Sequence, residues 1–133
     1  MEIFNLVVLV LSGGLLVFAG STRLVRPLKS LCLQTNLQRH GDDVTTDADM
    51  LSEMRGAGTF TLFAGLAILA GAVLPGLRPT SFTVGIVIFL GYAVGRSTSM
   101  FLDGKPSKAT VSGLGSEVLF SVLHTVCLVL LLT

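Results

Sequence analysis

The chain has 133 residues, of which 51% are hydrophobic and 13% are charged, and its mean hydropathy is +0.82. An ordinary soluble domain carries about 25% charged residues, so this composition excludes one and predicts that lipid surrounds most of the chain. The net charge is only +1. Together with the lack of any long basic run in the sequence, this charge argues against nucleic acid as a partner.

Stretches without Asp, Glu, Lys or Arg divide the chain into four segments. Residues 3–22 and 56–77 contain 20 and 22 consecutive residues of this kind. A helix needs roughly 20 apolar residues to cross a hydrocarbon core of about 30 Å. Residues 79–95 and 118–133 are shorter, with 17 and 16 residues, so they reach spanning length only if Arg96 and Glu117 lie inside their helices.

These segments predict an all-α fold, an antiparallel four-helix transmembrane bundle that forms a single membrane domain over residues 1–133. The helices are expected at about 3–22, 47–75, 79–102 and 107–132, with a cytoplasmic loop at about 23–46. Glu2 is the only charge before the first apolar segment. That segment therefore lacks the positive start of a signal peptide, and we expect it to be retained as a span.

The distribution of Lys and Arg predicts the orientation. Eight of these residues fall on the face that receives the first and third loops, namely Arg23, Arg26, Lys29, Arg39, Arg55, Arg96, Lys105 and Lys108. The opposite face has Arg78 alone. Because cytoplasmic loops carry the excess of basic residues, both termini are expected outside the cytoplasm, in a multi-pass membrane protein.

Charged groups within or at the end of the spans are the candidate functional residues, because a charge inside a membrane is costly. At about 1.5 Å of rise per residue, Glu117 and Arg96 lie about 24–25 Å from the outer ends of their helices. The same count places Arg55, Glu53 and Arg23 near the same inner edge. We predict that these five groups form one layer, in which Arg96 pairs with Glu117 or Glu53.

Helical spacing adds polar neighbours to this layer. Residues three and four apart share a helix face, so one stripe of the third helix holds Tyr92, Arg96, Ser99 and Asp103, and one stripe of the fourth holds Gly113, Glu117, Ser121 and His124. The candidate ligand-binding or structural charge cluster is Glu53, Arg55, Arg96, Ser99, Asp103 and Glu117. A secondary pocket is expected from Tyr92, Ser121 and His124. The spacing identifies no catalytic residue.

Three interpretations of the cluster stay open: an ion-pair cluster that fixes helix register, a site for a headgroup, quinone or small anion, and a proton or ion pathway. His124 lies about 10 Å deeper than Glu117 and is interpreted as a neutral ring bonded to a hydroxyl such as Ser12. A relay with Glu117, or a quinone or metal contact, is the alternative. His40 lies in the loop, so the spans have too few ligands for a metal, and no metal and no cofactor are expected. Cys32 and Cys127 lie at different depths, which predicts no disulfide.

Small residues recur at helical spacing, as in the pair Gly91 and Gly95 and in the series Ala57, Thr61 and Gly65. Such residues let membrane helices approach closely. They are expected to pack helices within the chain or, alternatively, to form a homo-oligomer through Gly91, Gly95 and Gly65. Membrane lipid is the other expected partner.

Two runs of residues carry a resemblance to a known family. The run Glu53-Met54-Arg55-Gly56, followed by Gly65-Leu66, resembles the second helix of a family of small bacterial four-helix membrane proteins catalogued as a domain of unknown function. Gly91, Gly95-Arg96, Ser99, Asp103-Gly104-Lys105-Pro106 and Glu117 resemble its third and fourth helices. The resemblance covers roughly residues 49–117, and it implies a four-helix bundle with these shared acids and bases but no activity. It also implies a location in a bacterial inner (cytoplasmic) membrane. The layout is also distantly similar to the DoxX-like proteins, some of which are linked to quinone or redox partners.

The charges and the resemblance together favour a non-enzymatic membrane module. It would bind a lipid-like or small ligand in a cytoplasmic-side charged pocket, or serve as an accessory subunit. A membrane-embedded enzyme or a quinone or redox component that uses the same pocket is the alternative. A proton- or ion-coupled transporter is the second alternative.

Overall fold

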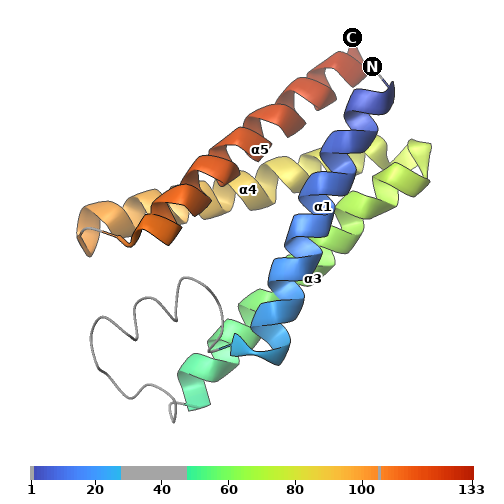
Figure 1. The fold of residues 1–133 in the computed structure, drawn as a ribbon. Helices are drawn as coiled ribbons and strands as arrows, with labels where there is room; N and C mark the ends of the chain where they lie inside the picture. The colour runs from blue at the N-terminus through green and yellow to red at the C-terminus, as the bar shows by residue number, and fades with distance from the viewer. Residues whose placement is uncertain (1, 28–47, 105) are drawn as a thin grey trace.

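The structure is a computed structural model that describes residues 2–27, 48–104 and 106–133 (Figure 1). Its long helices are α1 (Glu2–Val25), α3 (Ala48–Val73), α4 (Arg78–Leu102) and α5 (Lys108–Leu132), and a short 3-10 turn, η3 (Pro75–Leu77), separates α3 from α4. Each long helix is long and apolar enough to cross a membrane, which confirms the all-α architecture. Most of the expected loop at 23–46, including Cys32 and His40, lies outside the described residues.

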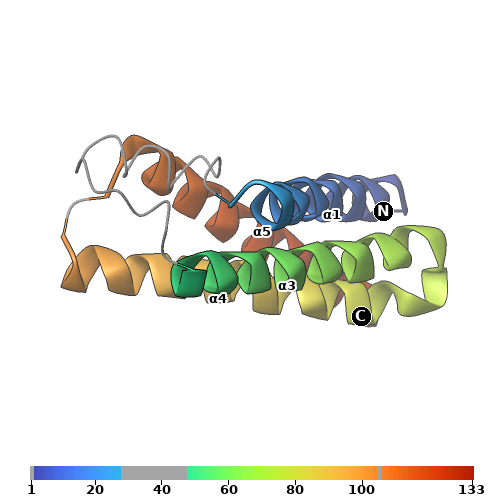
Figure 2. The same ribbon diagram turned by 90° about the horizontal axis from the view of Figure 1, so that it is seen from below.

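The helices run antiparallel and form two pairs. α1 packs along α3, α4 packs along α5, and α3 continues through η3 into α4, which lies against it. The two pairs diverge toward the end of the molecule that lies away from the chain termini (Figure 1). Seen from below, the α3–α4 connection and the α4–α5 connection lie at opposite ends (Figure 2). The orientation of the termini relative to a membrane stays a prediction from the Lys and Arg distribution.

Local chemistry explains why the α3–α4 and α4–α5 connections are short. Pro75 is the first residue of η3 and Pro79 is the second residue of α4. In the first turn of a helix the fixed φ of proline is suitable and its missing N–H costs nothing. Gly104 has φ +99°, a value that glycine adopts without steric cost. Ser107 then caps α5 by accepting a hydrogen bond of 3.3 Å from the Thr110 N–H.

Glycines set the distance between α1 and α3. A Cβ at Gly65 would lie 2.8 Å from both the Gly13 carbonyl oxygen and the Val17 nitrogen, so the two backbones are in contact there. Gly65 therefore acts inside the chain, as expected for close helix packing. Gly91 and Gly95 differ, because a Cβ at either position meets nothing within 4 Å. Their spacing does not mark a helix contact within the described chain.

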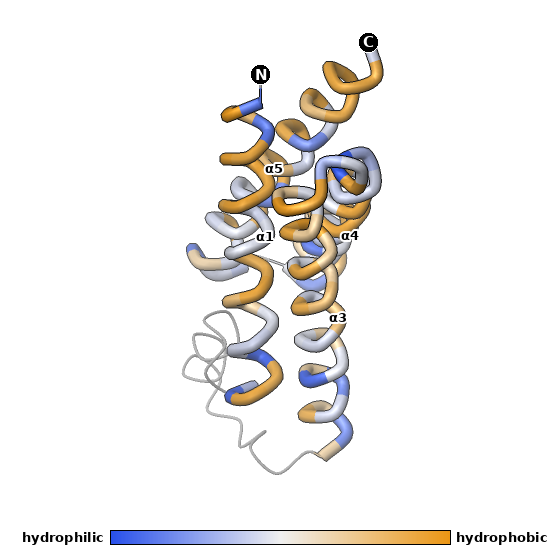
Figure 3. Tube along the Cα trace, turned by 90° about the vertical axis from the view of Figure 1, so that its right-hand side faces the viewer, coloured by the Kyte–Doolittle hydropathy of each residue, from blue (hydrophilic) through white to orange (hydrophobic). Residues whose placement is uncertain are grey.

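The core is small and the outer surface is apolar. In each span, no more than 39% of the most apolar stretch is buried inside the chain, which leaves the remainder to face lipid. Hydrophobic residues accordingly dominate the middle of the helices, and hydrophilic residues gather at the end of α3 that begins at Ala48 (Figure 3). The buried hydrophobic cluster consists of Val8, Leu9, Leu16, Ala64, Ile68, Phe82, Ile88, Phe89 and Cys127.

Candidate functional site

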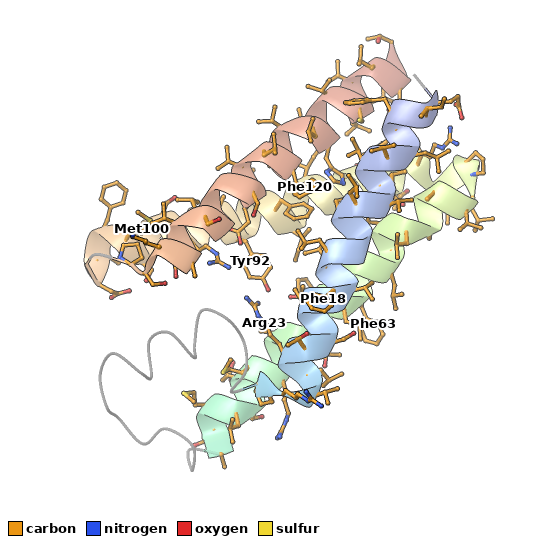
Figure 4. The ribbon with its side chains drawn as sticks, in the orientation of Figure 1. Phe18, Arg23, Phe63, Tyr92, Met100 and Phe120 are labelled. Atoms are coloured by element: carbon orange, nitrogen blue, oxygen red, sulfur yellow. The ribbon has the colours of Figure 1, made fainter. Side chains whose placement is uncertain are left out.

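Polar side chains from all four long helices meet where the two helix pairs begin to diverge. Arg23 of α1 and Tyr92 of α4 point toward one another across this opening (Figure 4). The remaining members of the set come from α3, α4 and α5. We call the set the polar cluster, and it consists of Arg23, Thr61, Tyr92, Arg96 and Glu117.

A directed chain of hydrogen bonds joins α3, α4 and α1 at Tyr92. The Thr61 hydroxyl donates to the carbonyl oxygen of Ala57 at 2.8 Å. A hydroxyl has one proton, so the Tyr92 hydroxyl is the donor in its 2.6 Å contact with Thr61. The Tyr92 oxygen in turn accepts from Nη1 of Arg23 at 3.0 Å, and the Arg23 guanidinium lies 5.6 Å from the centroid of the Tyr92 ring. The ring thus holds Arg23 by a hydrogen bond and a cation–π contact.

An ion pair joins α4 to α5 beside this chain. Nε of Arg96 lies 2.8 Å from Oε1 of Glu117, and the two side chains are only 18% and 10% exposed. Gly113 makes room for the pair, because a Cβ at that position would lie 3.0 Å from Nη1 of Arg96. Of the two partners that depth alone allowed for Arg96, the structure pairs it with Glu117 and not with Glu53.

Two cavities adjoin the polar cluster, and Arg23, Tyr92 and Arg96 line both. The larger has a volume of about 580 Å³ and mostly apolar walls. Its other lining residues are Phe60, Val87, Ile88, Gly91, Gly95, Ser99 and Thr110. The smaller has about 150 Å³ and contains Glu117. Its other lining residues are Leu15, Leu16, Ala19, Thr61, Phe89, Gly113 and Ser116.

Some of the predicted residues lie outside the polar cluster. Glu53 and Arg55 are exposed on α3 and line neither cavity. Arg55 precedes Thr61 by six residues, or about 9 Å of helical rise. Ser99 donates a 2.6 Å hydrogen bond to Asp103 at the exposed end of α4, and of these two only Ser99 lines the larger cavity. The structure therefore brings together Arg23, Arg96 and Glu117 from the predicted layer.

His124 lies in the buried centre of the fold and lines neither cavity. Its Nδ1 is 2.8 Å from the carbonyl oxygen of Phe120, and its Nε2 is 3.2 Å from the hydroxyl oxygen of Ser12. The carbonyl can only accept, so Nδ1 carries a proton. The expected hydroxyl partner, Ser12, is confirmed. Ser121 is buried as well, on the face that it was predicted to share with Glu117 and His124.

Sequence reasoning did not find every polar contact. It interpreted Thr61 as a small packing residue and assigned it no hydrogen bond. Nothing in the spacing of Thr61 and Tyr92 signals the bond between them. It also predicted no ion pair between Glu2 and Arg78, whereas Arg78 donates to Glu2 at 2.7 Å and joins the starts of α1 and α4. Their common assignment to the outer face was the signal that could have paired them.

The fold and the polar cluster define a multi-pass membrane protein with charged groups held between its helices. The chain belongs to the DUF4345 family, described as a domain of unknown function, whose model matches residues 4–128. This match confirms the resemblance and extends it over the first helix. Neither a curated protein nor a solved structure matches the chain.

Proposed function

We propose that this protein is a non-enzymatic membrane module that binds one lipid-like or small amphiphilic molecule in the larger cavity. The observation that carries the proposal is the form of that cavity: about 580 Å³, with apolar walls and with Arg23, Tyr92 and Arg96 at one side. Ligand sites are typically about 300–1,000 Å³ and combine apolar walls with a few polar groups. The site would serve a binding protein or the ligand-binding accessory subunit of a larger assembly.

The position of the cavity favours a ligand that arrives from the bilayer. Phe60 and Val87 line it and are 66% and 65% exposed, so its apolar wall is continuous with a surface that faces lipid. The charged side lies toward the end of α4 that is remote from the termini. We place the protein in a bacterial inner membrane, and the Lys and Arg distribution supports an orientation with this end on the cytoplasmic side. This orientation would set the ligand's polar part near the cytoplasm.

The proposal is tested by filling the cavity. A Cβ at Gly91 meets nothing within 4 Å and Gly91 lines the larger cavity, so Gly91→Phe introduces a ring there without a backbone clash. Gly14 on α1 is equally open but lines neither cavity, so Gly14→Phe is the matched control.

Native mass spectrometry of the protein purified in mild detergent is the measurement. We expect one bound amphiphile on the wild type and on Gly14→Phe, and its loss from Gly91→Phe. A wild-type protein that carries no ligand, and takes none up from added bacterial lipid extract, would reject the proposal. A bound quinone that undergoes reduction on the protein would replace it with the redox alternative.

A further inference from the structure

We infer that the ligand has a singly charged anionic head that also bears a hydroxyl donor, as in a phospholipid whose phosphodiester carries a polyol. The inference rests on the proposed function and names the ligand class for the same site. Three features carry it: the charge balance of the polar cluster, an unsatisfied oxygen on Glu117, and the relation between the two cavities.

The polar cluster holds more positive than negative charge. Arg96 is paired with Glu117, whereas Arg23 has Tyr92 as its partner, through the hydroxyl and the ring. Tyr92 is neutral, and no described carboxylate is paired with Arg23. Charge held away from water is costly unless it is compensated. A ligand with one negative charge would compensate Arg23, and a phosphate oxygen suits the planar donor set of an arginine.

Glu117 lacks one hydrogen bond that a ligand could supply. The residue is only 8% exposed, and its Oε2 has no hydrogen-bond partner among the described residues, although Oε1 is paired with Arg96. A buried acceptor without a donor costs free energy. Oε2 belongs to a residue that lines the smaller cavity, whose volume of about 150 Å³ leaves space for a small polar group.

The donor that fits Oε2 best is a neutral hydroxyl. An ammonium group would also donate, but its positive charge would cancel that of the phosphate and leave the charge of Arg23 uncompensated. A trimethylammonium group has no N–H to donate. A hydroxyl on an anionic phosphodiester satisfies Oε2 and leaves the phosphate charge available to Arg23, which distinguishes a glycerol head from ethanolamine and choline heads.

The two cavities allow one molecule to make both kinds of contact. Because Arg23, Tyr92 and Arg96 line both cavities, a phosphate beside the two arginines stands between them. Its polyol can then extend into the smaller cavity toward Glu117. The acyl chains would follow the apolar wall of the larger cavity, past Ile88 and Val87, toward the lipid-facing surface.

A series of lipids with identical short acyl chains tests the head on the wild-type protein. Phosphatidylglycerol is expected to bind most tightly in a titration followed by native mass spectrometry. Phosphatidylmethanol keeps the charge but lacks the hydroxyls, and we expect about 2- to 10-fold weaker binding from the loss of a hydrogen bond. Phosphatidylethanolamine and phosphatidylcholine should bind at least about 10-fold more weakly, because they leave the charge uncompensated.

An arginine variant tests the charge argument separately. Arg23→Gln should weaken phosphatidylglycerol binding by roughly 10-fold and reduce its advantage over phosphatidylethanolamine. Arg26→Gln is the matched control, because it removes the same charge three residues further along the chain. Arg26 is exposed and lines neither cavity. Glycerophosphoglycerol, which has the head without acyl chains, should not compete at equal concentration.

The outcomes separate this inference from the proposed function. Equal binding of phosphatidylglycerol and phosphatidylmethanol would overturn the proposed role of the hydroxyl. Equal binding of all four lipids would overturn the whole assignment of the head group. Neither result would contradict a lipid-binding cavity. Competition by glycerophosphoglycerol would overturn the inference that the ligand is a lipid and would identify it as a soluble phosphodiester. Failure of every lipid to bind the wild type would reject the proposed function itself.

Discussion

Arg96 and Glu117 face each other across α4 and α5, with 2.8 Å between Nε and Oε1 and with 18% and 10% of their side chains exposed. The pair joins α4 to α5 within the polar cluster. It also shares its surroundings with Tyr92 and Arg23. One contact therefore contributes both to helix register and to the charge of the candidate site.

Removing Arg96 should destabilise the fold strongly. Arg96→Ala leaves the Glu117 carboxylate buried without its partner, and breaking a buried pair in this way costs about 3–5 kcal/mol. Arg55→Ala is the control, because Arg55 is exposed on α3 and a surface substitution changes stability by about 0.5 kcal/mol or less. Thermal unfolding in detergent measures both. Equal unfolding temperatures for the two variants would show that the pair does not fix the register of α4 on α5.

Thr61 provides a test of the hydrogen-bond chain that ends at Arg23. Thr61→Val removes the hydroxyl that accepts a hydrogen bond from the Tyr92 O–H. The control is Thr59→Val, which removes a hydroxyl that donates to the Arg55 carbonyl oxygen of its own helix, at 3.0 Å. Both variants lose a hydrogen bond to a carbonyl oxygen of their own helix, so the difference in stability between them isolates the contact with Tyr92. We expect Thr61→Val to be less stable by about 1 kcal/mol in denaturant or thermal unfolding. A difference of zero would mean that the contact contributes nothing.

Much of the architecture follows from the cost of placing charge in lipid. Uncharged stretches defined the four helices, and the need to compensate a charge at equal depth led to the pairing of Arg96 with Glu117 or Glu53. These inferences require only the rise per residue of a helix and the thickness of a membrane. They do not depend on how the helices are rotated about their axes or how far the pairs diverge.

The remaining features do depend on rotation and divergence. Depth alone could not choose between Glu53 and Glu117 for Arg96, because both lie near the same edge. The spacing of Gly91 and Gly95 is typical of a helix contact, yet both residues line a cavity because α3 and α4 leave space there. Likewise, the meeting of Arg23, Thr61 and Tyr92 follows from the way three helices cross.

Ser12 should stabilise the fold through His124. Ser12→Ala leaves the buried Nε2 of His124 without the hydroxyl that now lies 3.2 Å away, and an unsatisfied buried polar atom costs about 1–3 kcal/mol. Ser12 also donates to the Val8 carbonyl oxygen of its own helix at 2.7 Å. Ser116→Ala is the control, because within the described chain Ser116 makes only a bond of this kind, to the Gly113 carbonyl oxygen at 2.7 Å. If the two variants unfold at the same temperature, the His124–Ser12 contact makes no net contribution to stability.

Gly85 should be the glycine least able to accept a methyl group in α4. A Cβ at this position would overlap the ring of His124, which is fully buried beside Phe82 and Phe89 and has no space to move into. Overpacking of this kind costs about 1–3 kcal/mol, so Gly85→Ala should unfold at a lower temperature than the wild type. Gly91→Ala on the same helix meets nothing within 4 Å and should be neutral or slightly stabilising, since alanine favours a helix over glycine by about 1 kcal/mol. A stable Gly85→Ala variant would show that the His124 ring is not fixed against α4.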